Sequence, residues 1–243
     1  MTDDRVWLCA IDLDEWEHVA PLLHPGDYPS PRLPEDARIA SAATDALIRV
    51  AIHEIAGPDV DPSALLNPEG MRRDTSLPFD AVQYSVSHAP HALAVAVSLS
   101  PVGIEIEPVP DTVDWRTLAH GLVSGALHPP DLRSQSARTA YERARLRAAT
   151  KASGEAMPVN QGDFPPLGTG WAHVGGADVY VHDISWRRDH AVAVAAHVQT
   201  SPVVLETTAS QVLERWRETT QGVDRAQRRR DTGTGSGSAV HSA

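Results

Sequence analysis

The chain contains one cysteine, one lysine and few aromatic residues among its 243 residues. The single cysteine, Cys9, has no partner for a disulfide within the chain, which favours a reducing, cytoplasmic setting. No stretch approaches the roughly 18 apolar residues that a membrane-spanning helix needs, so we expect no association with a membrane. The first residues, Met1-Thr2-Asp3-Asp4-Arg5, also lack the basic-then-apolar layout of a signal peptide.

Basic residues are outnumbered by acidic ones, 21 to 32, so the formal net charge is −11. Nucleic-acid binding needs a basic surface, so this balance argues against a nucleic-acid partner. Any anionic ligand would have to be held by a local cationic pocket. Arginine supplies almost all of the basic charge, which makes the only lysine, Lys151, a residue of interest.

The hydrophobic content of 42% is typical of a globular chain that buries a sizeable core. Apolar periodicity separates segments of alternating pattern from segments of helical pattern. It predicts strands at residues 6–11, 81–86, 92–99, 102–106, 178–184 and 191–198, and helices at residues 35–55, 136–152 and 205–217. Ser136 is the expected N-cap of the second of these helices.

A weak internal repeat links residues 91–97, which read His-Ala-Leu-Ala-Val-Ala-Val, with residues 190–196, which read His-Ala-Val-Ala-Val-Ala-Ala. Each copy lies downstream of a long predicted helix. We interpret it as an α+β fold of two pseudo-twofold-related halves, each a small antiparallel sheet packed against a long helix. The expected halves are residues 1–100 and 101–202, followed by a C-terminal helix at 203–220 and a disordered tail at 221–243. Two buried strands rich in Ala and Val would also look alike through composition alone.

Two carboxylates stand out in the segment Gly103-Ile104-Glu105-Ile106-Glu107. Side chains of a strand alternate between faces, so Glu105 and Glu107 should share one face, about 7 Å apart. Carboxylates at that spacing can share a hard cation such as Mg²⁺, which also accepts phosphate oxygens. A solvent-facing acidic strand edge would have the same pattern.

Ser87-His88 lies just before the expected turn at Ala89-Pro90 and offers a hydroxyl and an imidazole that could hold a phosphate. A Ser-His-acid nucleophilic site is less favoured, because the chain has no Gly-x-Ser-x-Gly elbow. The histidines near strand ends, His88, His91 and His190, lack the ligand spacing typical of a zinc site.

Several motifs follow one another in a family-like order. They are Asp45-Ala46-Leu47-Ile48-Arg49 on a helix, Gly70 in a turn-rich segment, Ser85-Val86-Ser87-His88, Gly103-Ile104-Glu105-Ile106-Glu107, and Lys151-Ala152-Ser153-Gly154 at a helix end. In order and spacing the chain resembles the surfactin-type 4′-phosphopantetheinyl transferases, over residues 5 to 198.

The resemblance implies transfer of phosphopantetheine from coenzyme A to a serine of an acyl or peptidyl carrier protein. Ser87, His88 and Lys151 would contact the coenzyme A phosphates. Arg72, in the turn after Gly70, would join these cofactor-binding residues. Glu105 and Glu107 would be metal ligands that hold Mg²⁺ beside the pyrophosphate.

The same resemblance places Arg147 where the family has an acid that binds the metal, and Leu146 and Arg143 where it has lysine and tryptophan. Opposite unit charges about 4 Å apart attract by about 4 kcal/mol at an effective dielectric near 20. A guanidinium there would also repel Mg²⁺. We therefore predict that Arg147 pairs with Glu105 or Glu107 and displaces the metal. The alternative sends Arg147 to solvent and lets Glu142 or Glu155 act in its place.

Three functional hypotheses follow from this pattern. The first is a diverged transferase with Glu105, Glu107 and Arg147 at its reactive centre. The second is a fold repurposed for another reaction on a natural-product or carrier-bound small-molecule intermediate, in which those residues or His88 act as acid, base or anion holder. The third is a non-catalytic binder of a carrier protein or of coenzyme A. We expect a monomer, because one chain would supply both sides of the cleft.

Overall fold

The computed structural model describes residues 5–10, 13–23, 34–57, 82–110, 129–154, 168–199 and 201–219. Arg72, Glu155 and the expected tail at 221–243 lie outside these described residues. The described chain has an α+β architecture with two four-stranded sheets. None of the described helices carries an apolar stretch of the length and purity that a membrane crossing requires.

The first sheet has the strand order β2-β3-β1-β8. Its strands are β1 (Arg5–Ala10), β2 (Gln83–Ala89), β3 (Ala92–Ser98) and β8 (Val203–Thr207). Strand β8 runs parallel to β1, whereas the other pairings in this sheet are antiparallel.

The second sheet has the order β4-β7-β6-β5 and is antiparallel throughout. Its strands are β4 (Val102–Pro108), β5 (Thr169–Val174), β6 (Ala177–Ile184) and β7 (His190–Ala196). The helices are α1 (Leu13–Leu23), α2 (Glu35–Ala56), α5 (Pro129–Ser153) and a further helix over residues 209–219.

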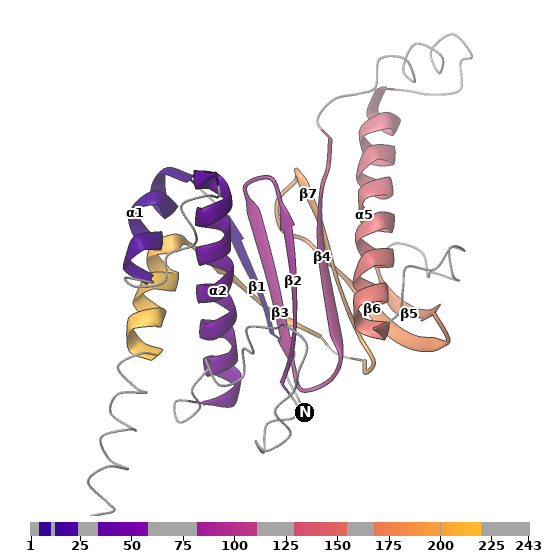
Figure 1. The fold of residues 1–243 in the computed structure, drawn as a ribbon. Helices are drawn as coiled ribbons and strands as arrows, with labels where there is room; N and C mark the ends of the chain where they lie inside the picture. The colour runs from indigo at the N-terminus through magenta and orange to yellow at the C-terminus, as the bar shows by residue number, and fades with distance from the viewer. Residues whose placement is uncertain are drawn as a thin grey trace, which may run out of the picture.

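The two sheets lie between helices, with α1 and α2 on one side and α5 on the other (Figure 1). Strand β3 accounts for much of this layering. Leu93, Val95 and Val97 pack against the helices, and Ala94 and Ala96 pack against the second sheet. A strand buried on both faces reads as a continuous apolar run, as this one does in the sequence.

Helix α5 approaches the second sheet closely because both surfaces carry small side chains. Ala144, Ala148 and Ala152 recur at every fourth residue and contact the sheet. A Cβ atom added to Gly103 in β4 would lie 2.0 Å from the carbonyl oxygen of Ala148. The backbone of α5 therefore lies almost directly on β4, and the residues next to this alanine stripe face the carboxylates of β4.

The end strands of the two sheets, β2 and β4, also contact each other, through two serine side chains of β2. The hydroxyl of Ser85 accepts a hydrogen bond from the backbone N–H of Ile104 at 3.0 Å. The hydroxyl of Ser87 accepts one from the N–H of Ile106 at 3.1 Å. Serine hydroxyls thus satisfy amides that would otherwise be buried donors without acceptors at this seam.

Several expected elements need correction. Ser136 is not an N-cap, because α5 begins at Pro129 and the serine lies inside the helix. The helix expected at 205–217 was wrong at its start: Leu205 belongs to β8, which pairs with β1, and the helix covers 209–219. The helical period predicted at 35–55 is confirmed as α2. Cys9 is buried, as a small apolar residue would be, and burial raises the pKa of its thiol to about 12.

Candidate functional site

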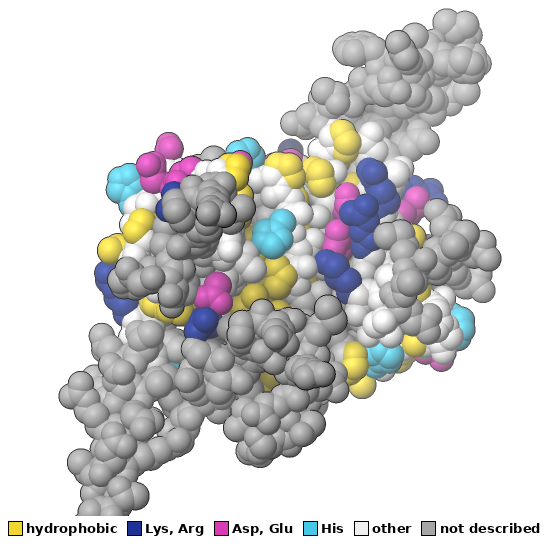
Figure 2. Space-filling view, in the orientation of Figure 1, with side chains coloured by type: hydrophobic (Ala, Val, Ile, Leu, Met, Phe, Trp, Pro, Cys, Tyr) yellow, Lys and Arg dark blue, Asp and Glu magenta, His cyan; other side chains and the backbone are white. Residues whose placement is uncertain are grey.

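An open cleft of about 390 Å³ is lined by residues of β2, β4 and α5. Its lining residues are Val86, Ser87, His88, Glu105, Arg147, Thr150 and Lys151. On the face shown in Figure 2, positive and negative side chains lie next to each other beside α5. Every site residue predicted from the sequence lines this cleft except Glu107, which bonds to Arg147 beside it, and Arg72, which is outside the described residues.

The carboxylates of Glu105 and Glu107 share the face of β4 that is turned toward α5. Ile104 and Ile106 take the other face and pack between the two sheets. The two glutamates are only 7% and 8% exposed, so they do not form a solvent-facing acidic edge. Buried carboxylates need partners, and helix α5 supplies them.

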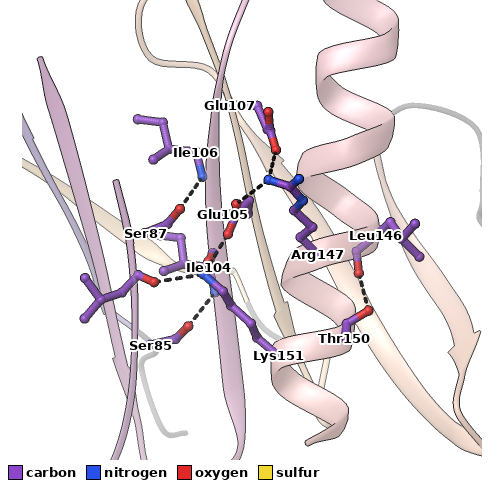
Figure 3. Close-up of polar contacts among 11 residues, drawn as sticks. Ser85, Ser87, Ile104, Glu105, Ile106, Glu107, Leu146, Arg147, Thr150 and Lys151 are labelled. Carbon is purple, nitrogen blue, oxygen red and sulfur yellow. Dashed lines mark hydrogen bonds and ion pairs between the residues drawn. The ribbon is translucent and has the colours of Figure 1, made fainter. Parts of the chain in front are cut away.

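Arg147 on α5 reaches across to both glutamates (Figure 3). Its Nη1 atom donates to Oε1 of Glu107 at 2.5 Å and to Oε1 of Glu105 at 3.4 Å. The contact predicted from the sequence is therefore present, and the guanidinium does not turn to solvent. Glu142, the acid considered as a substitute, pairs instead with Arg138 on the exposed side of α5.

Lys151 lies one helical turn beyond Arg147 and makes three contacts. Its Nζ atom donates to Oε2 of Glu105 at 2.6 Å, and to the carbonyl oxygens of Val86 and Ile104 at 2.8 and 2.9 Å. An ammonium group has three N–H donors, and these acceptors take all of them. In this arrangement Lys151 joins β2, β4 and α5, and it has no N–H left for a phosphate.

Ser87 is buried between the two sheets, and its hydroxyl accepts a hydrogen bond from the backbone N–H of Ile106. Its own O–H hydrogen is not used by that bond, because the hydroxyl acts there as the acceptor. Thr150 donates its hydroxyl hydrogen to the carbonyl oxygen of Leu146 one turn earlier in α5, so it faces the cleft as an acceptor.

His88 contacts helix α2, which packs on the first sheet. Its Nε2 atom lies 2.8 Å from the hydroxyl of Thr44 on α2. The side chain is exposed, yet the protein around the ring is enough to lower the pKa of His88. Partial burial is the main cause, the positive charge of Lys151 adds to it, and Glu105 acts in the opposite direction. The lowered pKa favours the neutral form of the ring.

Thr44 was not found from the sequence. It lies far from His88 along the chain, and a single threonine within a helical pattern carries no signal of such a contact. Only the packing of α2 against the first sheet brings the two side chains together.

The side chains that surround Glu105 and Glu107 do not fit the requirements of a bound Mg²⁺ ion. Magnesium binds oxygen ligands in a near-octahedral arrangement and keeps several waters. Here the two carboxylates already accept hydrogen bonds from a guanidinium and an ammonium group. Within the described ranges, no cluster of three or more His, Cys, Asp or Glu side chains is placed to hold a metal ion.

Neither a comparison with protein-family models nor a comparison with curated proteins gives a match to this sequence. The function must therefore be inferred from the residues of the cleft and from the order of the motifs that they belong to.

Proposed function

We propose that this chain is a diverged phosphopantetheinyl transferase-like protein that binds coenzyme A or a carrier protein without transferring phosphopantetheine. The observation that carries the proposal is the position of Arg147, whose Nη1 atom bonds to the carboxylates of both Glu105 and Glu107. A cation of the protein takes the place that Mg²⁺ would need.

The family part of the proposal is supported by the order of the motifs. Ser87, His88, Glu105 and Lys151 come from separate segments of the sequence and line one cleft. Two halves related by a pseudo-twofold axis, with the cleft at their seam, remain part of this proposal.

The loss of transfer follows from electrostatics. Mg²⁺ would have to break the contacts of Arg147 with both glutamates and then remain beside two positive side chains. Phosphoryl transfer depends on metal ions and cations that neutralise charge on the leaving group. Arg147 and Lys151 instead direct their charge to Glu105 and Glu107, so little of it is left to stabilise such a leaving group.

The test is incubation of the full chain with coenzyme A, Mg²⁺ and a panel of apo carrier proteins, followed by intact mass measurement of each carrier. We expect no carrier to gain the mass of phosphopantetheine, while an active transferase run in parallel modifies the same panel. Calorimetry in EDTA should still detect binding of coenzyme A or of a carrier. A mass gain on any carrier, or the absence of all binding, would overturn the proposal.

A matched variant sharpens the test. Arg147→Glu restores an acid at the position that the resemblance assigns to a metal ligand. We expect this variant, and not the wild type, to bind Mg²⁺ in calorimetric titrations, because three carboxylates then face one another across β4 and α5.

A further inference from the structure

A second pair of charged side chains lies beyond the cleft, between α5 and strand β6. Arg145 on α5 is only 2% exposed, and its Nε atom lies 3.4 Å from Oδ1 of Asp183. Asp183 also accepts a hydrogen bond from the backbone N–H of Gly168 at 2.6 Å. Neither member of the pair is among the residues that line the cleft, and neither stood out in the sequence.

The pair is held by charge more than by hydrogen bonds. Nε and Nη2 of Arg145 and Oδ1 of Asp183 are buried without a hydrogen-bond partner among the described residues. Burial also raises the pKa of Asp183, because water cannot fully solvate its carboxylate. The attraction within such a pair repays the cost of desolvation only in part, and apolar replacements of similar shape are often as stable or more stable. Stability alone therefore does not explain the pair.

The apolar contact between α5 and the second sheet leaves the rotation of the helix weakly defined. The sheet contributes only Ala and Val side chains to this buried cluster. Helix α5 contributes only alanines, which are Ala144, Ala148, Ala149 and Ala152. Short side chains of similar size interlock less than large ones of different shape, and interlocking is what selects a single arrangement. Polar contacts beside the alanines can supply the missing constraint.

Arg145 and Arg147 leave α5 on opposite sides of these alanines. With 3.6 residues per turn, their side chains point about 160° apart, and Ala144 and Ala148 lie between them. Arg145 reaches Asp183 on one side, and Arg147 reaches the glutamates of β4 on the other. A rotation of α5 that brings one arginine closer to its carboxylate moves the other one away.

We propose that Arg145 and Asp183 are positioning residues that fix the rotation of α5 and thereby hold Arg147 on Glu105 and Glu107. The consequence for metal binding rests on the proposed function, because the contacts of Arg147 are what occupy the metal position there. The buried pair thus controls the cleft from the other side of the helix.

A thermodynamic cycle tests this coupling. Arg145→Met combined with Asp183→Leu removes both buried charges and should leave the urea midpoint unchanged or higher. Arg147→Met is then introduced into the wild type and into this double variant, with EDTA present and no ligand. We expect the midpoint shift caused by Arg147→Met to fall to less than half in the double variant, because the guanidinium is there no longer held against Glu107.

Additive effects are the result that overturns the inference. Side chains two positions apart on a helix do not face each other, and sites without shared partners usually change stability independently. Equal shifts by Arg147→Met in both backgrounds would therefore mean that Arg145 and Asp183 do not position it. Arg138→Met is the matched control, since Arg138 pairs with Glu142 on the exposed side of α5 and should give the same small shift in both.

Asp183→Asn makes the test independent of the double variant. It keeps the shape of the side chain and removes the attraction to Arg145, so it should also reduce the shift caused by Arg147→Met. Should the double variant fail to fold, this single variant decides the outcome by the same criterion.

Titration with Mg²⁺ shows whether the coupling reaches the metal position. We expect millimolar Mg²⁺ to raise the urea midpoint of the double variant and not that of the wild type. A double variant that does not respond to Mg²⁺ overturns this consequence. The cycle needs no coenzyme A, carrier or metal, so its failure is distinct from that of the proposed function. A mass gain on a carrier would refute the non-catalytic proposal and leave the coupling standing.

Discussion

The Nη1 atom of Arg147 lies 2.5 Å from Oε1 of Glu107, a carboxylate that is only 8% exposed. The arginine itself is half-exposed at the mouth of the cleft, with 47% of its side chain accessible. A pair with one buried and one exposed partner behaves asymmetrically. Loss of the arginine leaves a buried charge, whereas loss of the glutamate leaves a cation that water can solvate.

Arg147→Met should lower the free energy of unfolding by about 1–3 kcal/mol, because Glu107 is left buried with its charge unpaired. Millimolar Mg²⁺ should recover part of this loss in the variant, since the freed carboxylates can then share a cation. Urea unfolding at neutral pH, with and without Mg²⁺, measures both effects.

The control for that substitution is Arg138→Met on the same helix. Arg138 pairs with Glu142, and both side chains are more than half exposed. We expect a change below about 0.5 kcal/mol and no response to Mg²⁺. If Mg²⁺ stabilises the wild type as much as it stabilises Arg147→Met, the guanidinium does not hold the metal position.

Lys151→Met should weaken the seam between the sheets, because the three bonds of Nζ to Val86, Ile104 and Glu105 are lost. We expect a loss of about 2–3 kcal/mol, typical of hydrogen bonds to a charged group. Hydrogen exchange should show where the loss falls. The amides of Ile104 and Ile106, which donate to serine hydroxyls at the seam, should exchange faster.

Arg143→Met is the matched control for Lys151→Met, since Arg143 is an exposed residue of the same helix. It should leave the exchange of both amides unchanged. Unaltered exchange in Lys151→Met as well would show that the lysine does not hold β2 and β4 together.

Gly103→Ala should cost about 1–3 kcal/mol, as overpacking does, because the new Cβ would lie 2.0 Å from the backbone oxygen of Ala148. Neither backbone segment can turn aside as a flexible side chain would, so α5 must move away from β4. We expect the contacts of Arg147 and Lys151 to loosen with it, and the variant to gain stability from Mg²⁺ where the wild type does not. Urea unfolding with and without Mg²⁺ measures both changes.

Gly176→Ala separates crowding from backbone strain. Gly176 has a positive φ of 82°, and a Cβ atom added there would meet nothing within 4 Å, so only the conformational cost of roughly 1–2 kcal/mol applies. A Gly103→Ala protein as stable as the wild type would mean that α5 does not press on β4 as closely as the geometry indicates.

The pH dependence of stability should carry a contribution from His88. Its pKa in the folded protein is lowered, chiefly by partial burial, relative to about 6.5 for an unfolded histidine. Between the two values the unfolded chain binds more protons, so stability is lost as the pH falls through about 6.5 and is intact above it. The wild type should therefore lose more stability than His88→Asn between about pH 7.5 and about pH 5.5.

His53 acts in the same direction, because burial also lowers its pKa, so a fall in stability with pH remains in His88→Asn. The difference between the two proteins isolates His88. Parallel stability curves across this pH range would show that the ring titrates alike in the folded and unfolded states.

Local sequence could predict which strand face carries the two glutamates of the site. It could not predict the long-range contacts that Lys151 and His88 make around them. Period-two alternation predicted that Glu105 and Glu107 share a face, and their common contact with Arg147 confirms it. The contacts of Lys151 with Val86 and of His88 with Thr44 join residues that are distant along the chain. No local pattern encodes such pairs.

The sequence by itself determined the helical period of α2, the strands that carry the site, and the opposite charges that would meet if α5 lay against β4. These follow from side-chain periodicity and from residue type, which act over a few neighbouring positions. Only the tertiary structure decided that β8 pairs with β1. It also decided that the ammonium group of Lys151 donates its hydrogen bonds to acceptors of β2 and β4. Those outcomes depend on how closely α5 and the two sheets pack, and that distance is set by Gly103 and the alanines of α5 together.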